Sequence, residues 1–210
     1  MATVRTDYIK KGKATLFTNP FLEKMTKTNP IQNIIVYGLV IAALIYVALA
    51  VKGLSLLTFL ALFLCAILFW TFAEYMLHRF LFHWVTEHPL SKRFHFVMHG
   101  AHHEYPKDEE RLLMPPVPGL LMAAVLFLLF YMLFALIGYS TFTWAFFPGF
   151  FLGYLMYSFV HRATHVYKPP AFLQPLWTHH SLHHYKYPKK AFGVSNRFWD
   201  RVFGTMPPRK

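Results

Sequence analysis

The chain has 210 residues, of which 56% are apolar and 14% charged, a composition that is unusual for a soluble domain. Its single cysteine, Cys65, lies within an apolar run, which excludes a disulfide framework, a CxxC zinc module and a pair of redox thiols. The net charge of +12 is not gathered on a recognisable nucleic-acid-binding module, so we expect no nucleic-acid partner.

The chain begins with a polar, basic segment, residues 1–30, and four uncharged runs follow it. The segment contains no apolar core of a signal peptide, so we expect no cleavable leader. We expect Arg5, Lys10, Lys11 and Lys13 to hold it against anionic lipid. Each uncharged run is about 20 residues long, enough to cross roughly 30 Å of hydrocarbon as a helix. The four predicted spans are residues 31–51, 54–73, 117–139 and 141–160.

The spans pair into two helical hairpins, because only a few residues separate the first from the second and the third from the fourth. The spans contain no Asp, Glu, Lys or Arg, so the sequence indicates no ion pathway through the bilayer. Of the 21 Lys and Arg residues, only Lys52 lies in a hairpin turn, and the positive-inside rule therefore places both termini in the cytoplasm. The sequence predicts an all-α membrane protein with four transmembrane helices, in which residues 31–210 form one domain and residues 74–116 and 161–210 form a cytoplasmic helical cap.

All thirteen histidines lie in this cap or at its boundary with the spans. Most recur at helical spacing, which aims several imidazoles to one side of a helix. Adjacent histidines diverge by about 100° on a helix, so the two members of such a pair suit two neighbouring metal ions. The spacing of five between His78 and His83 predicts that the helix bends or ends between them. Ten candidate ligands result, about five for each of two ions: His78, His83, His99, His102, His103, His161, His165, His180, His183 and His184.

Ligand chemistry narrows the choice of metal. Imidazole suits iron, zinc and copper, whereas magnesium and calcium prefer oxygen ligands. Iron can activate O₂, and an apolar membrane substrate offers many C–H bonds to oxidise and little to hydrolyse. The remaining histidines, His88, His95 and His179, are interpreted as surface, packing or outer residues of the site, although the spacing of four between His179 and His183 also suits a ligand.

Six segments carry a recognisable pattern: Glu74–His83, Phe94–His103, Arg111–Val117, His180–Lys186, Phe192–Ser195 and Phe198–Gly204. Their ordered histidine boxes and terminal Trp-Asp signature resemble the fatty acid hydroxylase superfamily, and within it most closely the fatty acid/sphingolipid 2-hydroxylases. The resemblance covers roughly residues 70–206.

The resemblance implies an integral membrane di-iron oxygenase that inserts a hydroxyl group at C2 of a long acyl chain, in a free fatty acid, an acyl thioester or a ceramide. It implies the same ten histidines as ligands of two iron ions, for which zinc can substitute in purified protein. Glu74, His95, Tyr157 and His179 are expected in outer or substrate-contacting positions. Glu74 either hydrogen-bonds a ligand imidazole or has a helix-end or charge-pairing role, and Tyr157 either lines the substrate route or packs.

Several alternatives stay open. Eukaryotic members usually carry an N-terminal cytochrome b5 domain that these residues do not contain, so we expect a separate electron donor, such as cytochrome b5 or a ferredoxin. For the same reason we expect a prokaryotic inner membrane rather than the endoplasmic reticulum.

The box His161–His165 also resembles the sterol desaturase branch, which leaves a sterol or carotenoid oxygenase as an alternative. A non-catalytic protein stabilised by zinc is another, whereas a metal transporter would place its ligands near the membrane midplane. The oligomeric state is open.

Overall fold

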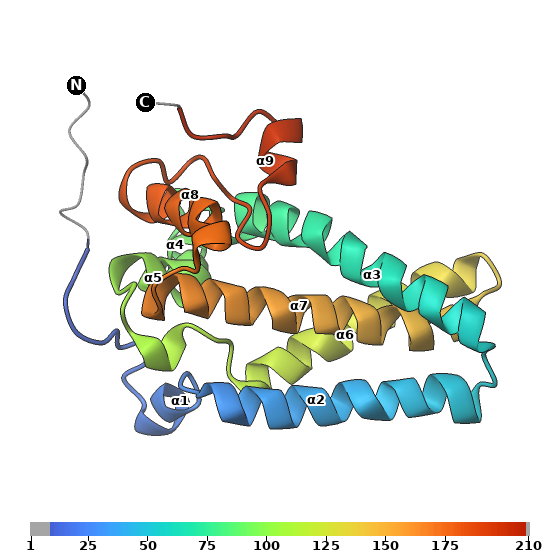
Figure 1. The fold of residues 1–210 in the computed structure, drawn as a ribbon. Helices are drawn as coiled ribbons and strands as arrows, with labels where there is room; N and C mark the ends of the chain where they lie inside the picture. Colours follow the sequence, from blue (N-terminus) through green and yellow to red (C-terminus); the bar gives the residue numbers. More distant parts are fainter. Residues whose placement is uncertain (1–8, 209–210) are drawn as a thin grey trace.

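The computed structural model describes residues 9–208, and within this range all regular secondary structure is helical. Four long helices dominate the fold (Figure 1). Each, with its flanking turns, is long and apolar enough to cross a membrane. The predicted all-α fold with four spans is confirmed. The helices are α2 (Pro30–Tyr46), α3 (Leu56–Met76), α6 (Pro116–Leu136) and α7 (Thr143–Val166).

Capping side chains determine where these helices begin, and glycines allow the turns that join them. The side chain of Asn29 caps α2 just before Pro30, and that of Ser55 caps α3, each by accepting a backbone N–H bond from the first helical turn. The two hairpin turns each contain a glycine with a positive φ, 64° at Gly53 and 81° at Gly138, which glycine adopts without strain. Both turns lie at one end of the molecule and the cap lies at the other (Figure 1).

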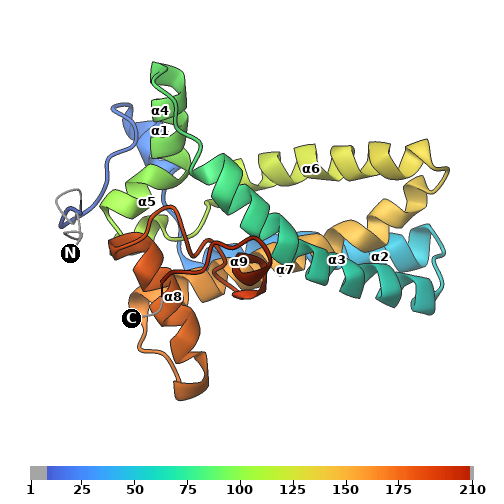
Figure 2. The ribbon, with the colours of Figure 1, turned by 90° about the horizontal axis from the view of Figure 1, so that it is seen from above.

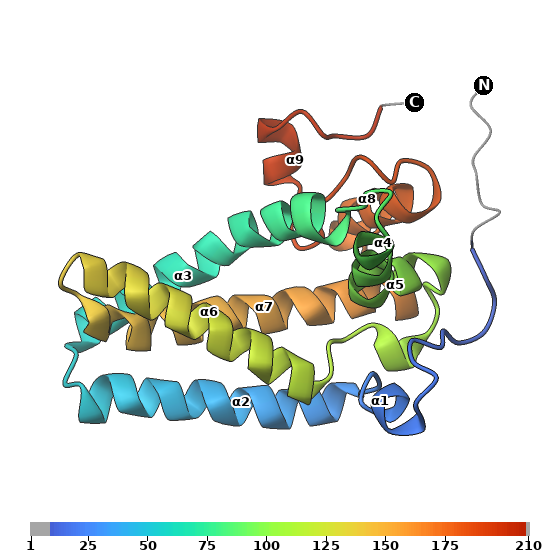
Figure 3. The same cartoon turned by 180° about the vertical axis from the view of Figure 1, so that it is seen from behind.

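The central span is α7. Within its apolar window 61% of the residues are buried, against 17% for α2 and α3 and 11% for α6. Gly153 lets α3 approach closely, because a Cβ atom there would lie 2.6 Å from the Cβ of Trp70. Figure 3 shows α6 crossing on the outer side of α7. The outer helices expose large apolar side chains such as Leu39, Leu57 and Leu136, as a lipid-facing surface requires.

The cap consists of short helices drawn from the two long loops, as predicted. Figure 2 shows α4 and α8 on opposite sides of the cap, with α9 lying over α3 and α7. The ring of Trp199 in α9 contacts that of Phe72 in α3 at a centroid distance of 4.9 Å, which fastens the end of the chain to the second span. The short helices are α1 (Pro20–Lys24), α4 (Pro89–His95), α5 (Ala101–Glu104), α8 (Gln174–Tyr185) and α9 (Phe198–Val202), with 3₁₀ turns at Glu109–Arg111, Ser140–Phe142 and Ala171–Leu173.

The described part of the N-terminal segment packs onto the cap. Leu16 is buried there. Lys10 pairs with Glu104 at 2.7 Å, and Lys13 pairs with another cap carboxylate at 2.6 Å. These two lysines therefore contact protein, where a lipid contact was expected, and Arg5 lies outside the described residues.

Candidate metal centre

His78 and His83 follow α3, where the helix continues with a wider turn. Residues Leu77–Phe82 form a π-helical segment, in which hydrogen bonds run between residues five apart. Residues at this spacing lie on one side of such a turn, and the two ring centroids are 5.1 Å apart. The helix ends at Phe82, between the two histidines, as one of the two expectations had it, and His83 forms its C-cap. The widening of the last turn was not predicted.

Three further helical segments supply the other candidate ligands. A second π-helical segment, Phe96–Gly100, leads directly into α5, and together they carry three of the histidines. The cap end of α7 presents His161 and His165 one turn apart, and α8 presents the last three. All ten candidate ligands are buried or partly buried in the cap.

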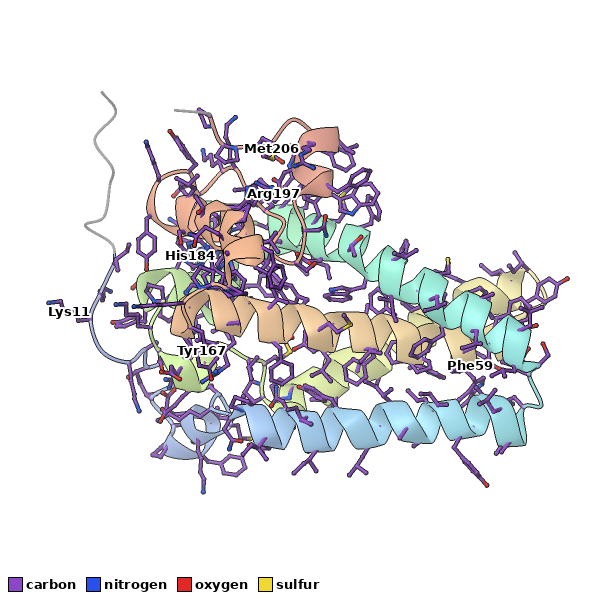
Figure 4. The ribbon with its side chains drawn as sticks, in the orientation of Figure 1. Lys11, Phe59, Tyr167, His184, Arg197 and Met206 are labelled. Atoms are coloured by element: carbon purple, nitrogen blue, oxygen red, sulfur yellow. The ribbon has the colours of Figure 1, made fainter. Side chains whose placement is uncertain are left out.

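The ten histidines divide into two groups of five, here called site 1 and site 2. Within each group, one ring nitrogen of every member lies within 4.8 Å of the others. Both adjacent pairs separate as their 100° divergence predicts, since His103 and His183 belong to site 1 and His102 and His184 to site 2. Figure 4 shows His184 in the cap over the end of α7. Site 1 comprises His78, His83, His99, His103 and His183, and site 2 comprises His102, His161, His165, His180 and His184.

The ring nitrogens of each site converge at short range. Nε2 of His99 lies 3.0 Å from Nε2 of both His78 and His103, and His102 has the same relation to two neighbours at 3.0 and 2.9 Å. One imidazole nitrogen carries either one proton or one lone pair, so it cannot satisfy two such neighbours by hydrogen bonding. Metal–nitrogen bonds of about 2.0–2.1 Å at right angles separate neighbouring nitrogens by about 3 Å. The donor set and its spacing therefore fit two metal ions.

Burial keeps these rings neutral. It lowers the pKa of His183 to about 4 and that of His83 to about 3. Burial, with the repulsion of neighbouring rings, also holds the pKa values of His99, His102 and His103 well below the usual range of histidine. A neutral imidazole has a lone pair available for a metal at neutral pH.

Backbone carbonyl groups of the loop after α8 orient two rings of site 1. Nδ1 of His78 lies 2.5 Å from the carbonyl oxygen of Phe192, and Nδ1 of His183 lies 2.7 Å from that of Lys190. A ring that donates its Nδ1–H to a carbonyl presents the lone pair of Nε2 on the opposite side. The loop therefore selects the ligand-competent tautomer of both rings.

Two buried carboxylates hold this loop in place. Asp200 accepts hydrogen bonds from the backbone N–H groups of Phe192 and Gly193 at 3.0 and 2.7 Å. Glu74 accepts from the N–H groups of the next two residues at 2.7 and 2.9 Å. Glu74 thus binds the loop, whereas a hydrogen bond to an imidazole was one of the expectations for it. Asp200 was not predicted as a functional residue, although it is the aspartate of the Trp-Asp signature.

The other residues expected near the site have distinct neighbours. Nε2 of His179 lies 2.9 Å from Oδ2 of Asp200, so this ring lies outside both histidine groups and supports the carboxylate. Nδ1 of His95 lies 2.6 Å from the carbonyl oxygen of Phe82, next to the His83 ring. His88 is exposed and caps α4, which agrees with a surface role.

An apolar cavity of about 370 Å³ lies beside both sites. His99 of site 1 and His161 of site 2 are part of its wall. Tyr157, whose ring is parallel to that of His161 at a centroid distance of 5.8 Å, lines the cavity as well. Most of the remaining wall is apolar and comes from α6, the loop before it and the N-terminal segment. The contribution of the N-terminal segment was not predicted, because basic composition gave no sign of a cavity wall.

Comparison with known proteins relates the chain to a described family. A family model described as fatty acid hydroxylase matches residues 63–205. The chain is 40% identical over 158 residues to the fatty acid 2-hydroxylase of Mus musculus, covering 72% of this chain and 41% of that protein. It is 38% identical over 206 residues to the ceramide very long chain fatty acid hydroxylase of Saccharomyces cerevisiae, covering 93% of this chain and 50% of that protein. The chain therefore spans about half the length of these curated relatives.

A solved structure shares the fold. A structure of full-length scs7p, in which only the hydroxylase domain is visible, matches with a TM-score of 0.82 and 40% identity, covering 94% of this chain and 74% of that chain. The resemblance noted in the sequence is thus confirmed. The curated relatives named above are eukaryotic, which gives no support to the expected prokaryotic membrane.

Proposed function

The chain belongs to the fatty acid hydroxylase family, and from that premise we propose that it hydroxylates C2 of a long acyl chain, with O₂ and two electrons, at the membrane surface. The names of the relatives refer to hydroxylation of fatty acids and ceramide, which favours an acyl substrate over the sterol or carotenoid alternative. The finding that carries the proposal is the apolar cavity of about 370 Å³ whose wall includes His99 from site 1 and His102 from site 2. A long apolar chain in this cavity would lie against both sites at once.

We assign the ten histidines of sites 1 and 2 as ligands of two iron ions. Zinc fits the same donor set, and its binding in place of iron would give an inactive protein. The chemistry that two bound iron ions supply is activation of O₂ with two electrons and two protons, which turns a C–H bond into C–OH and releases the second oxygen atom as water.

The protein residues have positioning roles in this proposal. The carbonyl groups of Phe192 and Lys190 fix the tautomers of His78 and His183, so that both rings are ready as ligands without rearrangement. The apolar cavity wall excludes bulk water from the acyl chain and aligns it along α6 and α7. No protein side chain is required as an acid or base toward the acyl C–H bond.

The partners in the proposal are a membrane lipid and an electron-transfer protein or domain, such as cytochrome b5 or a ferredoxin. The excess of Lys and Arg on the cap side supports a cytoplasmic position of both sites. The cap would therefore receive electrons from the cytoplasm while the acyl chain enters from the bilayer.

The test is expression in a host that lacks 2-hydroxylated lipids, followed by hydrolysis of total lipid and mass spectrometry of the acyl chains. We expect new 2-hydroxy acids from the wild type and their loss in His183→Ala, because removal of one imidazole leaves site 1 incomplete. His88→Ala is the matched control, since His88 is exposed on the cap surface, and it should retain the product. Hydroxylation that persisted in His183→Ala would contradict the assignment of site 1.

An assay with purified protein distinguishes the proposed hydroxylase from the alternative of a non-catalytic protein stabilised by zinc. Iron-loaded protein with a chemical reductant, O₂ and a ceramide should form 2-hydroxyacyl product, and zinc-loaded protein should form none. Absence of product from the iron-loaded protein would favour the non-catalytic alternative.

A further inference from the structure

An open groove of about 460 Å³ lies along one face of α8 and has no role in the mechanism above. Part of its wall is apolar, since Trp177 is buried there and Leu182 and Tyr185 are partly buried. Thr178 and Ser181 are exposed along the same face. No described residue lines both this groove and the apolar cavity beside the histidines. The groove is therefore a separate feature of the cap surface.

The other face of α8 carries three of the candidate metal ligands. His183 belongs to site 1, and His180 and His184 belong to site 2. The groove residues of α8 recur every three to four positions from Gln174 to Tyr185, so they form one stripe along the helix. A helix with its side chains is about 10–12 Å across. A molecule bound in the groove is therefore separated from ligands of both sites by about one helix diameter.

The helix α5 also supplies ligands to both sites, but the N-terminal segment lies against it. Leu16 and Ala101 belong to one buried apolar cluster. The backbone N–H of Lys10 donates to the carbonyl oxygen of Glu104 at 2.7 Å, and the side chains of these two residues pair as well. Of these two ligand-bearing helices, α8 is therefore the one whose outer face is left open by the groove.

The surface around the groove is basic. Residues 163–199, which include α8, contain five Lys and Arg residues and no Asp or Glu. Lys186 lines the groove, and Lys168 directly precedes Pro169, which lines it as well. Both lysines are exposed, and neither forms an ion pair with another residue in the range 9–208. Such a surface attracts a partner whose contacting face is negatively charged.

We propose that this groove and its lysines form the docking surface of the electron donor, an acidic protein that carries one electron, and that electrons reach both sites across α8. The inference rests on the proposed function, because that reaction uses two electrons for each O₂. Each encounter oxidises one donor by one electron and passes that electron to the loaded two-metal centre, so two encounters supply the pair. The docking surface consists of Lys168, Trp177, Thr178, Ser181, Leu182, Tyr185 and Lys186.

The first experiment measures binding of the donor without turnover. The zinc-loaded full chain, in micelles of an uncharged detergent, is immobilised and titrated with the soluble haem domain of cytochrome b5, an acidic one-electron carrier. At low salt, we expect Lys168→Glu combined with Lys186→Glu to weaken binding at least about 10-fold, because two attractive charges become repulsive. The difference should shrink below about 2-fold at about 1 M salt, where charges are screened within about 3 Å.

Unchanged affinity of this double variant at low salt would overturn the proposal and would leave anionic lipid as the partner of these lysines. The matched control is Lys24→Glu combined with Lys92→Glu. Both lysines are exposed, and the change in net charge is the same. Figure 2 shows their helices, α1 and α4, on the side of the cap away from α8. We expect the control to bind the haem domain within about 2-fold of the wild type. A loss as large as that at the docking surface would show that only total charge matters, which would overturn the assignment.

A second variant tests the groove without a change of charge. Ser181 is small and exposed within the groove, so Ser181→Trp should fill part of it and leave the thermal unfolding midpoint close to that of the wild type. We expect binding of the haem domain to be at least about 5-fold weaker at low and at high salt, because the obstruction is steric. Unchanged binding in a folded Ser181→Trp variant would overturn the role of the groove.

Electron delivery gives an independent reading. The iron-loaded protein is supplied with O₂ and either the reduced haem domain or ascorbate with a small redox mediator, which needs no docking surface. The ratio of product formed with the haem domain to product formed with the mediator should fall at least about 10-fold in the Lys168/Lys186 variant. An unchanged ratio would overturn the docking role. Absence of product from the wild type with either reductant would count against the proposed function, while the binding titrations would still decide on the docking surface.

Discussion

Sites 1 and 2 each contain five imidazoles but are supported in different ways. At site 1, the Nδ1 atoms of His78 and His183 meet carbonyl oxygens of a loop held by Asp200 and Glu74. At site 2, Nδ1 of His180 is buried without a hydrogen-bond partner within residues 9–208. Site 2 instead takes two pairs of rings from residues four apart on α7 and α8. Site 1 therefore depends on tertiary contacts of the C-terminal loop. Site 2 depends mainly on helix geometry, with one backbone hydrogen bond between Leu112 and the His161 ring.

Acid pH should destabilise the fold around both sites together, and this is the largest effect that we expect. The rings of His183 and His83 have pKa values of about 4 and about 3 in the fold, below the usual 6.5 of an unfolded histidine. At pH values between these folded-state pKa values and 6.5, the unfolded chain binds more protons than the folded chain. The free energy of unfolding therefore falls as pH decreases below 6.5. Each such ring contributes a loss of up to about 1.4 kcal/mol per pH unit.

The measurement is thermal unfolding of the metal-free full chain at pH 7.5 and pH 5.5. We expect the midpoint to fall by more than about 10 °C, since several rings titrate together. His88→Ala should show the same fall, because that ring is exposed. A midpoint that stayed constant over this range would mean that the buried rings do not need to be neutral in the fold.

Removal of one ligand should break one site and spare the other. His103→Ala deletes an imidazole of site 1, and His102→Ala deletes one of site 2. Each variant should retain about one metal ion per chain instead of two and should lose hydroxylation by at least about 100-fold. Metal content by mass spectrometry of the purified protein checks the first expectation, and lipid analysis checks the second. Retention of two tightly bound ions by either variant would contradict the division into two groups.

Much of this arrangement was predictable from helical spacing. Four uncharged runs predicted the spans, and the divergence of His102 from His103 predicted the division of the histidines into two groups. The widened turn at Leu77–Phe82 was not predictable, because the spacing of His78 and His83 suits an interrupted α-helix as well as a continuous π-helical turn. The sequence also gave no sign that Phe192 orients His78, since a backbone carbonyl is present in every residue and only the folded loop brings it near.

Loosening the loop should sharpen the difference between the sites. Asp200→Asn keeps the size of the side chain but removes the negative charge of the carboxylate, whose two oxygens accept hydrogen bonds from the N–H groups of Phe192 and Gly193. We expect metal affinity at site 1 to fall by about 10–100-fold while site 2 keeps its affinity. Chelator competition should then show two separate release steps. Glu87→Gln is the control, because that carboxylate is fully exposed, and an equal loss at both sites in Asp200→Asn would contradict the comparison.

The smallest effect should come from His95, which supports site 1 from outside the ligand set. Its Nδ1 lies 2.6 Å from the carbonyl oxygen of Phe82, at the end of the π-helical segment that precedes His83. His95→Gln retains a donor for that carbonyl but removes the ring that contacts the His83 ring, so metal affinity at site 1 should fall by less than about 10-fold. Site 2 should be unaffected in the same chelator titration, because His95 lies against His83 and not against a ring of site 2. Release of the site 2 ion at lower chelator concentration in this variant would show that the two sites are coupled, and the independence inferred from their different supports would then be wrong.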